Sequence, residues 1–239
     1  MSRPIDLVLV PGLLCDSTVW EQQARALGAF TTIQITDHGK LDSLAKMAEA
    51  ILERAPARFA LAGHSMGGRV AFEVLRRAAE RVIAVALMDT AYAPLSPGRE
   101  GKAEAMGRYA LLEVARTRGM RAMASDWVKN MVHPDRLEDA PLIESILTMM
   151  ERKSPDIFAA QIKALLERPD AAPLLANIRC PALVLCGRQD AWSTLPRHEE
   201  MAQRIPGSRL VVIEDCGHMS TMERPEAVTD ALRNWLGGI

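Results

Sequence analysis

The sequence predicts an α/β protein in which helices flank a mostly parallel sheet and one helical insertion interrupts the alternation of strands and helices. At both ends of the chain, short runs rich in β-branched residues alternate with longer helical patterns, as in βαβ units. The stretch from about residue 93 to residue 177 contains no strand-like run and reads as several helices. A length of 239 residues suits one such domain with one insertion.

Six short apolar runs are expected to form the strands of the sheet. They are Ile5–Val10, Thr31–Thr36, Arg58–Ala62, Val82–Met88, Ala182–Cys186 and Arg209–Ile213. Thr18, followed three residues later by Glu21, predicts a capping box at the start of the first helix. A further helix is expected from Met66 to about Ala78, and the last helix is expected to begin at Pro225.

The insertion divides the chain into two parts. We expect residues 1–92 and 178–239 to form the core and residues 93–177 to form a cap of helices near 99–117, 120–131, 139–152 and 156–167. Several cap methionines would suit an adaptable apolar wall over a pocket, although packing between the cap helices is the alternative. These are Met106, Met120, Met123, Met131, Met149 and Met150.

Charge and composition exclude several classes of partner. Lys and Arg number 29 and Asp and Glu number 30, a formal net charge of −1, so neither nucleic acid nor an anionic membrane is an expected partner. No apolar run reaches the roughly 18 residues of a membrane span, and the first residues lack the pattern of a secretory signal, so a cytoplasmic protein is expected. Cys15, Cys180, Cys186 and Cys216 lack paired CxxC spacing, so no structural metal site is expected.

The segment Gly63-His64-Ser65-Met66-Gly67 lies directly after a predicted strand and directly before a predicted helix. A serine at such a junction sits on a sharp turn and projects its hydroxyl from the carboxyl edge of the sheet. We expect the two glycines to be required because neighbouring backbone leaves no room for a Cβ. Ser65 is therefore the predicted nucleophile, and the alternative is a surface serine in a glycine-rich turn.

A serine nucleophile needs a base, and the position of His218 favours it over the other four histidines. His218 lies in the loop after the last predicted strand, so it should emerge at the same edge of the sheet as Ser65. The others are expected to be structural or exposed, with one beside the nucleophile pointing away on the tight turn. They are His38, His64, His133 and His198.

The base must in turn be oriented by a carboxylate, for which Asp190 is favoured. Asp190 follows the strand Ala182–Cys186 and completes the chain order Ser, acid, His. Asp89 is the rival acid, because it ends the strand that follows the nucleophile helix. Asp215 is too close to the histidine in sequence and is expected to cap a local turn.

An oxyanion intermediate requires two positioned N–H donors. We expect one from Met66, directly after the nucleophile, and one from Leu13 in the loop after the first strand, where Gly12 allows close approach of the backbone. An ordinary strand-ending Pro-Gly turn is the alternative for that loop. Cys15 nearby has no supporting pattern of His and Asn or Asp, so a buried or lining thiol is expected.

Together these motifs resemble those of the α/β-hydrolase fold family with a helical cap. The resemblance spans nearly the whole chain and rests on PGLL after the first strand, GHSMGG at the elbow, GRQD after the cap and GH near the end. It implies a triad of Ser65, His218 and Asp190, with oxyanion donors at Leu13 and Met66. It also implies a sheet of about six or seven strands, because the first strand resembles the family's third. Many members carry His-Gly where this chain has Pro-Gly, which should leave the donor geometry intact.

The predicted reaction is acyl transfer to water through an acyl-enzyme. A serine in place of an aspartate argues against the epoxide-hydrolase and haloalkane-dehalogenase branches of the fold. Small carboxylic esters, lactones and enol-lactones fit the scheme, and a cap of roughly 80 residues favours an enclosed site for a small molecule. We expect Arg69, Trp20 and Trp192 to contact the substrate, and the chemistry requires neither a metal nor another cofactor.

Arg69 keeps a second reaction class open. The elbow GHSMGGR is similar to that of the menaquinone-pathway synthase of this fold, in which the corresponding arginine helps to hold an anionic substrate. Arg69 would lie one helical turn beyond Ser65 and could bind a carboxylate through two hydrogen bonds, unless it is only a structural or solvated arginine. The alternatives to an ester hydrolase are therefore a C–C hydrolase or lyase and a non-catalytic binding protein. The sequence predicts no oligomeric state.

Overall fold

The computed structural model describes residues 4–239 and contains a six-stranded sheet whose strands all run parallel, in the order β2-β1-β3-β4-β5-β6. The strands are β1 (Ile5–Val10), β2 (Thr31–Ile35), β3 (Phe59–His64), β4 (Val82–Met88), β5 (Ala182–Gly187) and β6 (Arg209–Ile213). All six predicted strands form, with bounds within two residues of those expected. The predicted α/β fold is therefore confirmed, with a strand count at the lower end of the expected range.

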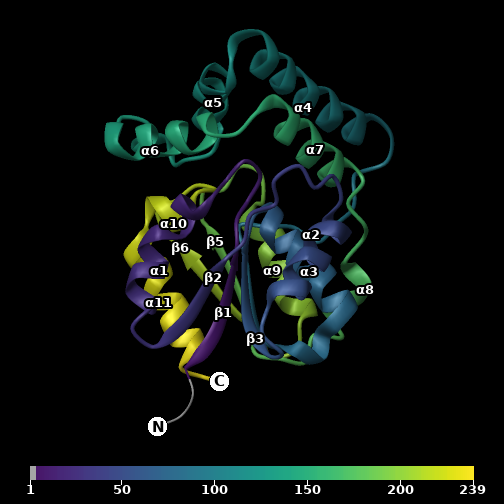
Figure 1. Ribbon diagram of the computed structural model, residues 1–239, viewed down its shortest axis with the longest axis vertical. Helices are drawn as coiled ribbons and strands as arrows, with labels where there is room; N and C mark the ends of the chain where they lie inside the picture. Colours follow the sequence, from purple (N-terminus) through teal and green to yellow (C-terminus); the bar gives the residue numbers. More distant parts are fainter. Residues whose placement is uncertain (1–3) are drawn as a thin grey trace.

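Helices cover both faces of the sheet, as parallel strands require. In Figure 1, α1 (Glu21–Leu27) and α11 (Pro225–Leu236) lie on one face, and α2 (Leu44–Arg54) and α3 (Met66–Ala78) lie on the other. The remaining helices of this part are α9 (Leu195–Arg204) and the short α10 (Ser220–Glu223).

The predicted capping box at the first helix is wrong. A 3₁₀ turn, Ser17–Trp20, precedes α1, and Asp16 caps that turn by accepting a hydrogen bond from the Thr18 N–H at 2.9 Å. No side chain caps α1 itself. The cap residue therefore lies two positions earlier than the pattern predicts, because the chain turns once as a 3₁₀ helix before the α-helix begins.

Five helices lie between β4 and β5 in the chain. They are α4 (Gly98–Arg118), α5 (Met120–Trp127), α6 (Ala140–Glu151), α7 (Pro155–Leu166) and α8 (Ala172–Leu175). Figure 1 shows α4 to α7 as a layer above the carboxyl ends of the strands, whereas α8 lies beside the core. We call α4 to α7 the cap. The helix expected over 120–131 is shorter than predicted because a 3₁₀ turn, Val128–Asn130, follows α5. Within residues 4–239, no helix is long and apolar enough to cross a membrane.

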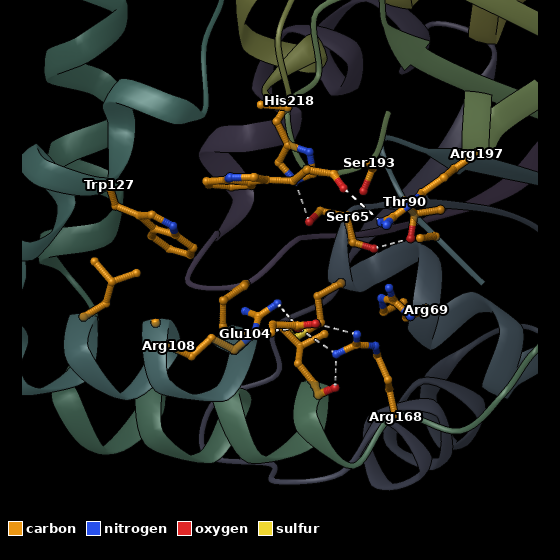
Figure 2. Close-up of a pocket in the computed structure, with 18 of the residues that line it drawn as sticks. Ser65, Arg69, Thr90, Glu104, Arg108, Trp127, Arg168, Ser193, Arg197 and His218 are labelled. Atoms are coloured by element: carbon orange, nitrogen blue, oxygen red, sulfur yellow. Dashed lines mark hydrogen bonds and ion pairs between the residues drawn. The ribbon is translucent and has the colours of Figure 1, made fainter. Parts of the chain in front are cut away.

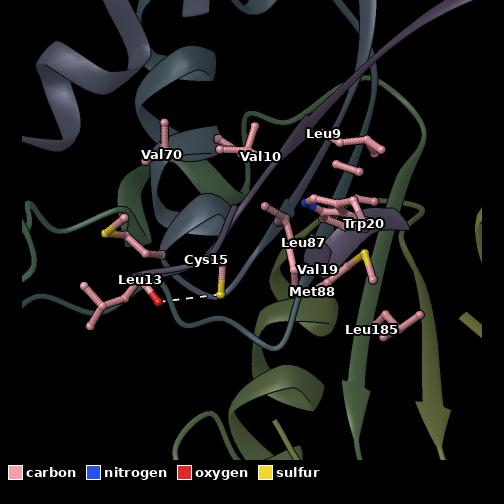
Figure 3. Packing of buried hydrophobic residues seen from close by; sticks show 14 of the residues in the cluster. Leu9, Val10, Leu13, Cys15, Val19, Trp20, Val70, Leu87, Met88 and Leu185 are labelled. Atoms are coloured by element: carbon pink, nitrogen blue, oxygen red, sulfur yellow. Dashed lines mark hydrogen bonds between the residues drawn. The ribbon is translucent and has the colours of Figure 1, made fainter. Parts of the chain in front are cut away.

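The central strands are buried along almost their whole length, β3 completely so. Leu9 of β1 and Leu87 and Met88 of β4 lie in one buried cluster with Trp20, whose side chain is 0% exposed. Figure 3 shows this cluster beside the loop that carries Leu13. Strand ends anchored in such a core hold the loops that follow them in fixed positions, and these loops carry the candidate site.

Candidate active site

Ser65 occupies a strained turn between β3 and α3. Its φ is 55° and its ψ −117°, a conformation that non-glycine residues rarely adopt. Hydrogen bonds hold the turn from both sides: the Ser65 N–H donates to the Met88 carbonyl at 2.8 Å, and the Thr90 hydroxyl donates to the Ser65 carbonyl at 2.7 Å. The serine side chain is thereby directed into a cavity at the carboxyl edge of the sheet.

The two glycines of the elbow are required by close backbone contacts, as expected. A Cβ on Gly63 would lie 2.3 Å from the Gly67 carbonyl oxygen, and a Cβ on Gly67 would lie 2.1 Å from the Val10 carbonyl oxygen. Both distances are far below van der Waals contact. The turn can therefore form only where these two positions lack a side chain.

A line of hydrogen bonds joins Ser65, His218 and Asp190. His218 Nε2 lies 2.8 Å from Ser65 Oγ, and His218 Nδ1 lies 2.7 Å from Asp190 Oδ2. The second oxygen of Asp190 accepts the N–H groups of Trp192 and Ser193 at 2.8 and 2.9 Å, so both oxygens of this carboxylate have partners. This network assigns the proton to Nδ1, which leaves Nε2 free to accept the serine hydroxyl.

Burial and charge set the pKa values along this line. Burial, the largest single influence, lowers the pKa of His218, but the charge and hydrogen bond of Asp190 together with the charges of Asp89 and Glu223 outweigh it, so the net shift is upward. Burial would raise the pKa of Asp190, whereas the charge and hydrogen bond of His218 and the two backbone N–H groups lower it below its usual range. Asp190 is thus an ionised partner that favours the protonated imidazole.

Asp89, the rival acid, makes no hydrogen bond to His218. Its carboxylate accepts the Gly187 N–H at 3.0 Å and the Ser220 hydroxyl, and it lies 3.6 Å from Nε2 of His64. Burial and the negative charge of Asp190 raise the pKa of Asp89 well above its usual value. Asp215 is exposed and lies 3.9 Å from Arg224.

The other histidines serve the scaffold. His64 Nε2 lies 2.8 Å from the His218 carbonyl oxygen, and burial lowers the pKa of His64 to about 4, so its ring is neutral and contacts the backbone of the catalytic loop. His198 accepts the Thr90 N–H at 3.1 Å. His38 contacts the Pro11 carbonyl, and His133 accepts the N–H of Asp135.

Leu13 and Met66 both line the cavity beside Ser65, where their backbone N–H groups were expected to meet an oxyanion. The loop carrying Leu13 is fixed from the cap, because the Leu14 N–H donates to the side-chain oxygen of buried Gln161 at 2.9 Å. Sequence reasoning missed Gln161, which lies 147 positions from Leu14. Cys15 is a buried thiol, as expected, and burial raises its pKa to about 12.

Glu223 holds the loop of His218 and was also missed from sequence. Its buried carboxylate accepts the N–H groups of Gly217 and Met219, the two neighbours of His218, both at 3.1 Å. It also accepts the His133 N–H at 2.7 Å, which ties this loop to the segment after α5. Burial raises the pKa of Glu223 above its usual value, although the three N–H donors act in the opposite direction. The only sequence signal was an acidic residue five positions after the histidine.

The cavity has a volume of about 480 Å³ and lies between the core and the cap. Trp192, an expected substrate contact, lines it with its ring 4.9 Å from that of His218 and stacked on Trp127 at 5.3 Å. Arg69 also lines it, as expected. Figure 2 shows Ser65 between Trp127 on one side and Arg69 on the other.

The structure contradicts one expectation about the lining and decides one alternative that the sequence left open. Trp20 does not line the cavity, because its ring is fully buried in the core and packs edge-on against His64. None of the six cap methionines lines it either: Met106 is 72% exposed, and the other five are buried between elements of the cap. The apolar part of the lining instead comes from the aromatic residues Trp127, Phe158 and Trp192 and from aliphatic residues such as Leu111 and Leu165.

Comparison with known proteins identifies the class of protein to which this fold and site belong. Residues 7–231 match the model of the Alpha/beta hydrolase family, and the chain therefore belongs to this family. It is 28% identical to the pimeloyl-(acyl-carrier protein) methyl ester esterase of Nitrosomonas europaea, over 92% of this chain and 91% of the relative.

Two solved structures match nearly the whole chain. A thermophilic esterase from Thermogutta terrifontis, solved with malate bound, is 30% identical with a TM-score of 0.86, over 100% of this chain and 91% of that one. The enol-lactonase from Burkholderia xenovorans is 26% identical with a TM-score of 0.86, over 99% and 92% of the two chains.

Proposed function

We propose that the protein hydrolyses a small-molecule carboxylic ester or lactone through an acyl-enzyme on Ser65. At the level of class, the chain is a carboxylic ester hydrolase, like the esterases and lactonases that it resembles. The observation that carries the finer proposal is the continuous line from Ser65 Oγ through His218 to Asp190, with its serine end in the cavity.

In this mechanism His218 acts as the general base. Its Nε2 takes the proton of Ser65 Oγ as the oxygen attacks the substrate carbonyl carbon, and the resulting imidazolium gives that proton to the leaving alcohol oxygen. Water then attacks the acyl carbon in the same way, with His218 again as base, and the acid leaves as Ser65 regains its proton. Asp190 holds the tautomer and stabilises the imidazolium.

The negative charge that develops on the carbonyl oxygen would meet the N–H groups of Met66 and Leu13. The N–H of Met66 lies at the start of α3, where the helix dipole also favours negative charge. Leu13 approaches from the loop after β1, whose geometry depends on Gln161. Each such donor contributes about 10²- to 10³-fold to the rate of acyl transfer.

Cavity size and lining support a small substrate in preference to a polymer or a lipid surface. A volume of about 480 Å³ falls within the range of small-molecule pockets. The two named relatives with a stated substrate are named for the methyl ester of pimeloyl-(acyl-carrier protein) and for an enol-lactone, so the bond named in each is a carboxylic ester or a lactone. We therefore propose a short-chain ester or lactone.

The test compares p-nitrophenyl acetate and butyrate hydrolysis by the wild type and Ser65→Ala. We expect kcat to fall by about 10⁴- to 10⁶-fold in the variant, because the triad acts as a unit. Cys15→Ala is the control for a thiol nucleophile and should retain activity within about threefold. An acetyl adduct should be found by mass spectrometry on the peptide that contains Ser65. Turnover that survives in Ser65→Ala would overturn the proposal.

A further inference from the structure

Positive charge gathers in the lining of the cavity. Four arginines from three helices and a loop face it, Arg69 on α3, Arg108 on α4, Arg197 on α9 and Arg168 after α7, against one lining carboxylate, Glu104. The whole chain has a formal net charge of −1, so this cluster does not reflect a generally basic protein. Figure 2 shows these side chains around one end of the cavity, below and beside Ser65.

Two of the arginines are already engaged by the single carboxylate. Arg168 binds Glu104 through two hydrogen bonds of 2.8 Å each, and Arg108 donates to the same carboxylate at 3.0 Å. Arg168 is 9% exposed and also donates to the Leu165 carbonyl at 2.8 Å. These contacts make Arg108, Glu104 and Arg168 a fixed wall of the cavity.

The other two arginines have only backbone partners in the described chain, residues 4–239. Arg69 donates from Nη1 to the Ala93 carbonyl at 2.9 Å, and Arg197 donates from Nη1 to the Trp192 carbonyl at 3.3 Å. A guanidinium carries five N–H donors, so most donors of each remain available. Burial and the nearby charge of Arg168 lower the pKa of Arg69 to about 9, so Arg69 is protonated at neutral pH but its charge is poorly compensated.

The position of Arg69 sets how far an anion bound to its guanidinium would lie from the reacting atoms. Arg69 follows Ser65 by four residues on the same helix, which places its Cα about 6 Å further along the helix axis. An anion bound there would lie a few bonds from a carbonyl carbon at Ser65 Oγ. The other side of the cavity is aromatic, with Trp127 stacked on Trp192.

We propose that this cavity selects esters or lactones that carry a carboxylate, and that Arg69, assisted by Arg197, binds that carboxylate while the apolar part of the substrate packs against Trp127 and Trp192. Arg108, Glu104 and Arg168 keep the wall in place and are not the primary ligands. The inference rests on the proposed function for the identity of the reacting group, but the binding of the anion does not require turnover.

The first experiment compares matched charged and neutral substrates. The carboxylate is placed on the acyl part in mono-4-nitrophenyl glutarate, against 4-nitrophenyl pentanoate, and on the alcohol part in 4-acetoxybenzoate, against its methyl ester. We expect the charged member of at least one pair to have a kcat/KM about tenfold or more above its neutral partner, falling with added salt. The pair that shows the preference identifies which part of the substrate carries the anion.

Substitutions then test which arginines cause the preference for the charged ester. Arg69→Met should lower kcat/KM for the preferred charged ester by about ten- to hundredfold and leave its neutral partner within about threefold. Arg197→Met should act in the same direction by about three- to tenfold, and because Arg197 is exposed, this variant remains informative if Arg69→Met folds poorly. Arg118→Met is the matched control, since Arg118 is an exposed cap arginine outside the cavity.

Binding separates this inference from the proposed hydrolysis. Glutarate is titrated into Ser65→Ala, and into Ser65→Ala combined with Arg69→Met, with the fluorescence of Trp127 and Trp192 as the signal. If no ester is turned over, the proposed hydrolysis fails. The inference is still supported in that case if glutarate binds Ser65→Ala and does not bind Ser65→Ala combined with Arg69→Met. Where esters are turned over, a preference for the neutral member in both pairs, or an equal loss on charged and neutral esters in Arg69→Met, overturns it. Absence of both turnover and glutarate binding overturns both.

Discussion

The two walls of the cavity are built by different means. On the core wall, Ser65, His218 and Asp190 follow the ends of β3, β6 and β5, and backbone contacts fix each of them within a parallel sheet. On the cap wall, side-chain contacts place Glu104 and Trp127: Glu104 binds Arg168 just after α7, and Trp127 packs against Phe158 of α7. The proposed reaction and the proposed selection therefore divide differently between the walls: the proposed catalytic groups all follow strands of the core, whereas the residues proposed to select the substrate come from both walls, Arg69 and Arg197 from core helices and Trp127 from the cap.

The cap also contacts core loops that carry proposed catalytic groups. Gln161 of α7 accepts the Leu14 N–H, and the segment after α5 receives the His218 N–H on the Met131 carbonyl at 2.7 Å. Both contacts end on loops of the core that carry proposed catalytic groups. The cap is therefore part of the support of the site as well as its cover.

The largest expected effect tests which of two buried carboxylates of the core wall, Asp190 or Asp89, orients His218 in the proposed reaction. Asp190→Asn should lower kcat by about 10⁴-fold, because an amide in contact with Nδ1 disfavours the tautomer that can accept the serine proton. Asp89→Asn should lower kcat by about tenfold at most, because Asp89 makes no hydrogen bond to His218. Steady-state kinetics on one p-nitrophenyl ester measures both.

Equal losses in these two variants would show that the carboxylates act together, and a larger loss in Asp89→Asn would exchange their roles. Circular dichroism and the thermal midpoint of each variant separate lost chemistry from lost structure. Both substitutions keep the size of the side chain, so the core should remain packed.

The second prediction compares how the free energy of unfolding changes when one glycine of the core wall and one glycine of the cap wall are each replaced by alanine. Gly67→Ala places a Cβ 2.1 Å from the Val10 carbonyl oxygen and should cost about 3 kcal/mol or more of the free energy of unfolding. Gly107→Ala in α4 meets no atom within 4 Å and should stabilise the protein by about 0.5–1 kcal/mol, because glycine is a poor helix former. Thermal midpoints at one scan rate are the measurement.

We expect the midpoint to fall by about 10 °C in Gly67→Ala and to rise by about 2 °C in Gly107→Ala. Failure of Gly67→Ala to fold agrees with the prediction. A midpoint within about 2 °C of the wild type in that variant would show that β1 and α3 can move apart, contrary to the fixed elbow described above.

The same contrast explains what could be predicted from the sequence. The elbow was predictable because the strand, the turn and the helix around Ser65 are consecutive, and the two glycines at fixed spacing mark positions without room for a Cβ. The positions of Asp190 and His218 followed from the rule that parallel strands end at one edge. Each of these inferences needs only a short segment and its place in the chain order.

The support and the lining could not be predicted in this way. Gln161 and Leu14 are 147 positions apart, and nothing local marks either as the partner of the other. Trp20 was misplaced because an aromatic residue near the first loop can face either the core or the cavity, and the packing of β1 against β3 decides which. The role of the cap methionines stayed open for the same reason: helical spacing shows that a face is apolar but not what covers it.

The smallest expected effect concerns Glu223, whose carboxylate joins the His218 loop of the core to His133 of the segment after α5. The negative charge of Glu223 is one of the influences that raise the pKa of His218, although a lesser one than Asp190. Glu223→Gln should therefore lower the pKa of His218. Hydrolysis needs neutral His218, so kcat/KM falls as the pH drops through this pKa. The acid limb of the profile should accordingly move to lower pH in the variant.

A second consequence of Glu223→Gln should accompany the shift. The amide has only one acceptor oxygen for the N–H groups of Gly217, Met219 and His133, so the loop should loosen and the plateau of kcat/KM should fall by about tenfold. A residue that only supports the fold would lower the plateau and leave the limb in place, so the limb is the decisive readout. Glu226→Gln, an exposed position in the first turn of α11, is the matched control and should change neither. An unmoved limb with a reduced plateau would restrict Glu223 to holding the loop and leave Asp190 as the carboxylate that sets the charge of His218.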